Sequence, residues 1–228
     1  MNDAPMLLRA ADRPRAVVPV RRRALCSGFA VLLLAGCGAL PSKPARPVLY
    51  DFGPGAMVSQ PLTQGALPPL VLSDVGANSR LEGVQILYRF SYADANELRP
   101  YGLSLWSQPP AQLLRERLRQ GLSAGHMVIG PEDSAAVTRS AGHAPDQLRV
   151  TLEEFSQVFQ SPDQSVGLVR LSATLTRSNP GGERMVAQRS FAAQRPAPTS
   201  DAPGGVKALA AASDAVVAEI VTWVDQVH

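Results

Sequence analysis

Hydrophobic and polar residues alternate along two stretches in the second half of the chain. Residues 148–153 (LRVTLE) and 169–176 (VRLSATLT) change character at nearly every position. Because the side chains of a strand point to opposite faces in turn, both stretches predict strands with one buried and one wet face. The sequence NPGG at 179–182 predicts a turn, and residues 184–193 return as a third strand. Together they predict an antiparallel meander.

The C-terminal segment changes to helical spacing. From Val206 to Val227 apolar residues recur at alternating intervals of three and four, which predicts one helix with a broad apolar stripe. We interpret this stripe as packing on the sheet; the alternative is a coiled-coil partner, for which three heptads are barely enough. A shorter helix is predicted from Pro110, since proline suits a first turn, to a stop at Gly121 or Gly125.

The remaining apolar runs predict shorter strands. They lie at 48–52, 70–75, 84–90, 98–101 and 127–129. Strands, a helix, more strands and a final helix favour an α+β fold in two layers, in which a mostly antiparallel sheet carries two main helices packed on one face.

Charge is distributed unevenly along the chain. The 228 residues have a formal net charge of +3, and the pI is about 9.2. The first 36 residues hold six arginines and two aspartates, or +4, so the remaining 16 basic and 17 acidic side chains leave −1. The basic excess therefore belongs to the N-terminal segment, and we expect no nucleic-acid partner.

The residues after these arginines have the layout of an export signal. An apolar run at 24–35 is too short for the ~30 Å hydrocarbon core of a bilayer, and small residues follow it. Residues 34–37 (LAGC) resemble the lipobox of bacterial lipoproteins. This resemblance implies cleavage before Cys37, a diacylglycerol on its thiol and an acyl chain such as palmitate on its amine.

We therefore expect a signal peptide at 1–36, a lipidated Cys37 with a flexible tether up to residue 47, and a folded domain at 48–227. Several acyl chains hold a protein at a membrane surface, whereas one chain binds only marginally. Gly38 stands where an aspartate would retain a lipoprotein at the inner membrane. The expected location is thus the periplasmic side of the envelope, with the outer membrane favoured over the inner.

Candidate catalytic groups do not form a working constellation. Residues 121–125 (GLSAG) fit the G-x-S-x-G pattern of esterases, but that pattern needs a strand before the serine and a helix after it. Here the predicted order is reversed. The three histidines are widely separated, and Glu153 and Glu154 are adjacent on a predicted strand, so their side chains point to opposite faces. We expect no catalytic residue, no metal and no cofactor.

Three short motifs resemble one family of envelope proteins. They are YDFG at 50–53, VQILYR at 84–89 and LWSQPP at 105–110, and IVTWV at 220–224 ends the last helix. In this order, and over 48–227, they resemble the ABC-type transport auxiliary lipoproteins, the accessory components of MCE-type lipid transport systems. Leu105 departs from the family, in which a basic residue often precedes the tryptophan.

The resemblance implies a non-enzymatic lipoprotein that assists an ATP-driven transporter in moving lipids between the two membranes of the envelope. Its partner would be an MCE-domain substrate-binding protein and, through it, an ABC permease and ATPase. The membrane would be reached through the lipid anchor. The resemblance leaves the oligomeric state open.

Tyr88, Arg89 and Trp106 are the residues that we expect at a partner contact, because aromatic and arginine side chains are enriched at interfaces. Each has a structural alternative: Arg89 in an apolar strand needs a partner or water, and Trp106 suits a core as well as an exposed anchor. Two other functions stay open. One is a structural or activating envelope lipoprotein without a transport role, and the other is a lipid-binding carrier with a groove between helices and sheet.

Overall fold

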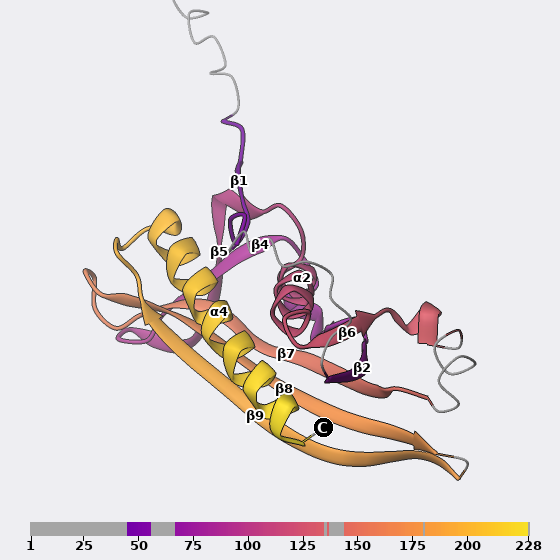
Figure 1. Ribbon diagram of the computed structural model, residues 1–228. Helices are drawn as coiled ribbons and strands as arrows, with labels where there is room; N and C mark the ends of the chain where they lie inside the picture. The colour runs from indigo at the N-terminus through magenta and orange to yellow at the C-terminus, as the bar shows by residue number, and fades with distance from the viewer. Residues whose placement is uncertain (1–44, 56–66, 135, 137–143, 180, 228) are drawn as a thin grey trace, which may run out of the picture. The chain divides into compact units, whose positions relative to one another are not determined.

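Two α-helices cover one face of a nine-stranded mixed sheet in the part of the chain that the computed structural model describes (Figure 1). The described residues are 45–55, 67–134, 136, 144–179 and 181–227. The predicted signal peptide and Cys37 lie outside them, as does most of the predicted tether. Residues from Ala45 onward form one compact unit of their own.

The elements alternate along the chain as the α+β prediction requires. The strands are β1 (Val48–Tyr50), β2 (Leu67–Leu72), β3 (Gly76–Ala77), β4 (Gln85–Phe90), β5 (Asp94–Trp106), β6 (His126–Ile129), β7 (Asp146–Phe159), β8 (Ser165–Asn179) and β9 (Gly182–Pro196). The α-helices are α2 (Pro110–Leu122) and α4 (Ala202–Val227). Two short 3-10 helices, η2 (Ser79–Leu81) and η3 (Pro131–Asp133), lie in the described connections.

The predicted meander is confirmed and is longer than its alternating core. β7, β8 and β9 pair antiparallel over 14 or 15 residues each. At the predicted turn the Asn179 side chain accepts a hydrogen bond from the Gly181 amide at 3.0 Å, and Gly182 has φ of 115°, a conformation that favours glycine. The strict alternation of β7 ends at a bulge between Leu152 and Glu154, which is why the sequence pattern fades there.

The other edge of β7 carries a succession of short parallel strands. β2, β3 and β4 pair with β7 one after another, and η2 leaves the sheet between β3 and β4. β5 then pairs antiparallel with β4, β1 pairs parallel with β5, and β6 pairs parallel with β2. The longest pairings are therefore antiparallel, as predicted, and the parallel additions make the sheet mixed.

β5 is the strand that the sequence predicted least well. The prediction covered 98–101, whereas β5 runs for 13 residues from Asp94 to Trp106. Polar residues and Pro100 hide it in the sequence pattern, since its pairing with β4 and β1 rather than its own periodicity holds it extended. Its register against β4 shifts between Gln85 and Leu87, where β5 is irregular.

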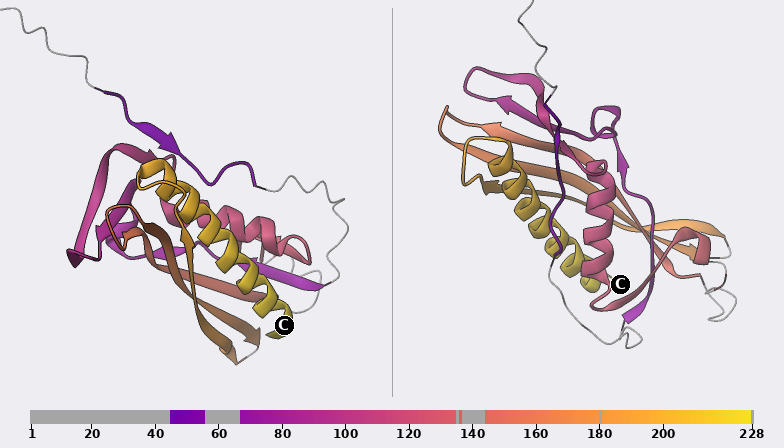
Figure 2. Two further views of the ribbon diagram at one scale, coloured as in Figure 1. Left: turned by 90° about the vertical axis from the view of Figure 1, so that its left-hand side faces the viewer. Right: turned by 90° about the horizontal axis from the view of Figure 1, so that it is seen from above.

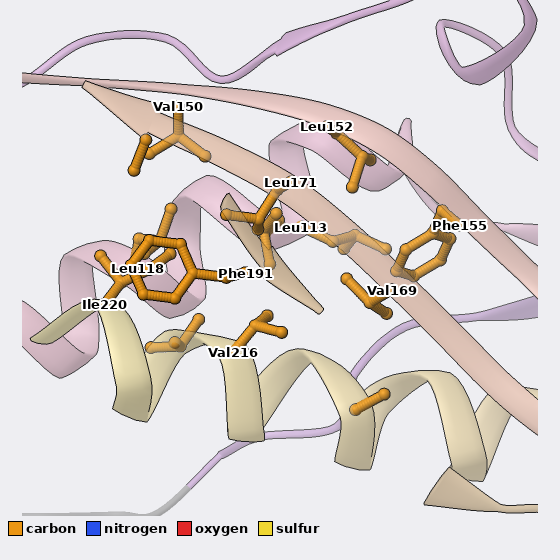
Figure 3. Close-up of a cluster of buried hydrophobic side chains, with 14 of the residues drawn as sticks. Leu113, Leu118, Val150, Leu152, Phe155, Val169, Leu171, Phe191, Val216 and Ile220 are labelled. Atoms are coloured by element: carbon orange, nitrogen blue, oxygen red, sulfur yellow. The ribbon is translucent and has the colours of Figure 1, made fainter. Parts of the chain in front are cut away.

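The helices pack side by side on the same face of the sheet, α4 along β8 and β9 with α2 beside it (Figure 2). Leu209, Val216 and Ile220 of α4 are fully buried, so the predicted stripe packs on the sheet and is not open to a coiled-coil partner. A Cβ at Gly167 of β8 would lie 2.5 Å from the α4 backbone at Ala208, which shows how closely the two elements approach. Figure 3 shows this core, in which Leu113 and Leu118 of α2 meet sheet residues such as Leu171.

Candidate functional site

Five aromatic rings gather at the end of the sheet formed by the β4–β5 hairpin and the last residues of β7. This aromatic cluster consists of Tyr88, Phe90, Tyr92, Tyr101 and Phe159. The ring centroids of Tyr88 and Tyr101 are 4.5 Å apart, and those of Phe90 and Phe159 are 5.1 Å apart. These separations are typical of favourable aromatic pairs.

The cluster runs from the core to the surface. Phe159 is buried, Tyr88, Phe90 and Tyr101 are partly exposed, and the Tyr92 side chain at the hairpin tip is 50% exposed, 5.6 Å from Phe90 between ring centroids. An exposed tyrosine that leans on a fixed ring presents a large contact area at low cost in conformational entropy. The cluster is thus a preformed apolar surface with polar tips.

Strand pairing explains why these distant residues meet. The parallel pairing of β4 with β7 sets Tyr88 opposite Gln157 and Phe90 opposite Phe159, and the hairpin sets Arg99 opposite Tyr88. The Arg99 guanidinium lies 5.4 Å from the centroid of the Phe90 ring, which is a cation–π distance. A hydrogen bond to the Glu97 carboxylate raises the pKa of Arg99, so an ion pair of Arg99 with Glu97 lies at the rim of the cluster.

A buried hydrogen-bond chain fixes the base of the cluster. The Tyr101 hydroxyl donates to Gln157 Oε1 at 2.8 Å, and Gln157 Nε2 donates to Ser165 Oγ at 2.8 Å. Burial raises the pKa of Tyr101, so this hydroxyl stays a donor. A Cβ at Gly205 would collide with the Gln157 side chain, which places this end of the cluster against the first turns of α4.

Arg89, predicted at a partner contact, has a partner within the chain. Its guanidinium donates to both carboxylate oxygens of Glu154, at 3.0 and 3.1 Å, and to the Ala95 carbonyl at 2.9 Å. Glu154 is buried beside the β7 bulge and also accepts from Ser156 Oγ at 2.7 Å. The ion pair therefore ties the hairpin to β7 and positions the aromatic cluster.

Trp106 contributes to the core. Its side chain is 1% exposed and its ring stands edge-on to Phe52 and Phe155, with centroids 5.7 and 5.6 Å away. The prediction of a partner contact is wrong for this side chain, because a ring without exposed area offers no surface to another protein. Tyr88 lies in the aromatic cluster, so the structure brings Tyr88 and Arg89 to the same hairpin and separates Trp106 from them.

The YDFG motif is likewise structural. Asp51 Oδ1 accepts a hydrogen bond from the Gly53 amide at 2.7 Å, and Gly53 has φ of 73°, so the chain turns sharply after β1. The Phe52 carbonyl accepts a hydrogen bond from Arg117 of α2, whose Nε lies 3.3 Å from the Asp214 carboxylate of α4. This turn joins the start of the fold to both helices.

The G-x-S-x-G sequence ends a helix, as its predicted context required. Ser123 Oγ donates to the Arg119 carbonyl at 2.7 Å, within α2. His126 is buried, with Nδ1 2.9 Å from the Pro68 carbonyl and Nε2 3.1 Å from the Asp225 carboxylate. The Ser123 hydroxyl thus stabilises the end of α2, and the His126 ring connects β6 with β2 and α4.

A groove of about 650 Å³ lies between the first half of α2 and residues 74–82. It is lined by Asp74, Val75, Gly76, Ala77, Glu82, Gln108, Pro109, Ala111, Gln112, Arg115 and Glu116. A lining this rich in charged and amide side chains is unsuited to an acyl chain, so the groove gives the carrier alternative no support.

Neither α-helix of the described residues is both long and apolar enough to cross a membrane.

Comparison with known proteins decides the family. Residues 50–221 match the family described as ABC-type transport auxiliary lipoprotein component. The chain belongs to this family. The family consists of auxiliary lipoproteins and is not a catalytic family, and its description associates it with ABC-type transport.

Solved structures show the same fold. A crystal structure of a Xanthomonas campestris protein has a TM-score of 0.58 at 18% identity and covers 79% of this chain and 93% of its own. A second, uncharacterized protein has a TM-score of 0.55 at 19% identity, with 79% of this chain and 99% of its own covered. No curated protein matches the sequence.

The family motifs of this auxiliary lipoprotein and its aromatic cluster overlap only at Tyr88. Trp106 carries the resemblance and lies in the core, and Phe52 packs partly buried against that core. Phe90, Tyr92, Tyr101 and Phe159 complete the aromatic cluster and were not named as site residues. A signal for Phe90 and Tyr92 existed in the sequence FSY at 90–92, where two aromatic residues stand at the end of the strand predicted for 84–90. Phe159 had no such signal, since only the pairing of β4 with β7 brings it near.

Proposed function

We propose that this protein is anchored by acyl chains on Cys37 at the periplasmic face of the outer membrane and assists MCE-type lipid transport through protein–protein contact. Its direct partner is an MCE-domain substrate-binding protein, which connects it to the ABC permease and ATPase. Family membership over residues 50–221 supports the transport context. The LAGC sequence at 34–37 supports the anchor.

The aromatic cluster carries the proposal of partner contact. Tyrosine, phenylalanine and arginine are enriched at interfaces, and tyrosine and arginine dominate binding hot spots. Here Phe90, Tyr92 and Arg99 combine these types on one hairpin, half-exposed and stacked on a buried base. Arg89 is a positioning residue: its ion pair with Glu154 holds the hairpin that carries these three side chains.

Site-specific photocrosslinking in cells tests this function. A benzophenone amino acid replacing Tyr92 is expected to crosslink the MCE-domain protein, identified by mass spectrometry of the adduct. The same amino acid replacing Met185, which is 57% exposed on β9, is the matched control and is expected to give no such adduct. An MCE adduct from Met185 alone, or from neither position, would contradict the proposal.

A further inference from the structure

Apolar side chains gather on the strand at which the fold begins. Six large apolar side chains are exposed among the described residues, and three of them lie on β1 and its neighbour β5. Val48 is 51% exposed, Leu49 64% and Leu103 53%. Single exposed apolar residues are ordinary, but adjacent ones at a sheet edge mark a surface that contacts something apolar.

Strand register places two of these residues, Leu49 and Leu103, on the same side of the sheet. β1 is the edge strand of the sheet, with Val48 in register with Ser104 and Leu49 with Leu105. Leu103 stands two residues before Leu105, so strand alternation sets it on the same side as Leu49, away from the buried Trp106. Val48 is adjacent to Leu49 and in register with Ser104, so its side chain points to the opposite face. We call Leu49 and Leu103 the β1 patch.

The chain that precedes the patch limits what can reach it. Ten residues lie between Cys37 and Val48, and the eleven steps along the chain, at ~3.6 Å each, reach at most about 40 Å. From Gly38 to Tyr50 the sequence has Lys43 and Arg46 and no acidic residue. A short basic segment that leads into exposed aliphatic side chains matches the chemistry of an anionic bilayer surface.

We infer that the β1 patch rests on the membrane that holds the lipid anchor, with Leu49 and Leu103 inserted at the boundary between headgroups and acyl chains. The inference rests on the proposed anchor at Cys37 and adds a second, non-covalent contact. Together the two contacts fix which side of the domain faces the bilayer. The aromatic cluster, on a different part of β5 and on β4, is then left for the protein partner.

Tryptophan fluorescence on vesicles tests the contact. The chain from Cys37 onward contains the whole compact unit and has one thiol, which can be coupled to a maleimide lipid in vesicles of phosphatidylcholine and phosphatidylglycerol. This coupling supplies the anchor, so the result does not depend on lipidation in the cell. Leu49→Trp and Leu103→Trp report the patch, because Trp106 and Trp223 are buried.

We expect bromine on the acyl chains to quench the emission of Leu49→Trp and Leu103→Trp roughly twofold, as suits side chains ~5–10 Å below the headgroups. Met185→Trp, of similar exposure on the far edge strand β9, is expected to keep its emission. Equal quenching at all three positions, or none at Leu49 and Leu103, overturns the inference. Absence of quenching there assigns the patch to a protein or a second copy instead.

Discussion

Single residues of this protein divide into those that build the aromatic cluster and those that hold it in place. Arg89 was predicted at the surface because arginine is common at interfaces, yet its guanidinium makes three hydrogen bonds within the chain. Sequence reasoning could state that Arg89 needs a partner but could not name Glu154, which lies across a parallel strand pair. The residue's role is therefore positioning.

Loss of the Arg89–Glu154 ion pair is expected to destabilise the fold. Glu154→Gln leaves a mostly buried guanidinium without its countercharge, which costs about 2–3 kcal/mol in the free energy of unfolding. Urea denaturation followed by circular dichroism measures this. Glu183→Gln is the control, since its pair with Arg149 is exposed and is worth less than about 1 kcal/mol. Equal effects of the two substitutions would show that Glu154 is not a structural anchor.

At the scale of elements, the local hydrophobic pattern of the sequence predicted those strands and helices whose formation depends on that pattern. The meander and both helices follow from alternation and helical spacing, and all are present. The parallel alignment of β2, β3 and β4 on β7 depends on contacts between segments that are distant in the sequence. A short apolar run does not indicate with which strand it pairs. The aromatic cluster depends on that alignment, so the sequence showed only Tyr88 of it.

The N-terminus of α4 offers a test by pH. Asp201 caps this helix by accepting hydrogen bonds from Thr199 Oγ1 at 2.6 Å and from the Gly204 amide at 2.9 Å. These bonds lower the pKa of Asp201 from its ordinary value of 3.8, so the cap stabilises the fold above that pH and is lost as the pH falls through the folded pKa.

Asp201→Ala is expected to cost about 1 kcal/mol at neutral pH, the usual value of a helix cap. The difference from the wild type should disappear in denaturation experiments at a pH below the lowered pKa of Asp201, where both chains lack a charged cap. Glu219→Ala, at an exposed position in the second half of α4, serves as the control without capping geometry. A difference that persists unchanged in acid would show that the carboxylate charge does not act there.

At the scale of the whole molecule, the protein has a near-neutral folded domain that follows a basic N-terminal segment in the sequence. The family, the fold class and the absence of a local catalytic geometry at Ser123 were accessible from sequence, because they rest on motif order and element order. The proposed division of the surface between partner and membrane was not accessible from sequence, because it depends on which strands reach the edge of the sheet.

Lipid attachment at Cys37 is expected to determine where the molecule resides. Intact-mass spectrometry of the protein purified from cell envelopes should show a chain beginning at Cys37 with added acyl mass. Cys37→Ala should give an uncut precursor without lipid, because only a thiol forms the thioether to diacylglycerol. Cys26→Ala is the control and should leave the mature mass unchanged, since Cys26 lies in the expected signal peptide. Wild-type protein without a lipid adduct would contradict the anchor.

The binding affinity of the MCE-domain protein for Tyr92→Ala tests the central claim most directly. Titration by isothermal calorimetry should give a Kd raised at least about 30-fold, which corresponds to a hot spot of ~2 kcal/mol. Met185→Ala, which removes an equally exposed side chain on β9, should bind as the wild type does. An unchanged Kd for Tyr92→Ala, with the wild type bound, would contradict the assignment of the aromatic cluster as the partner contact.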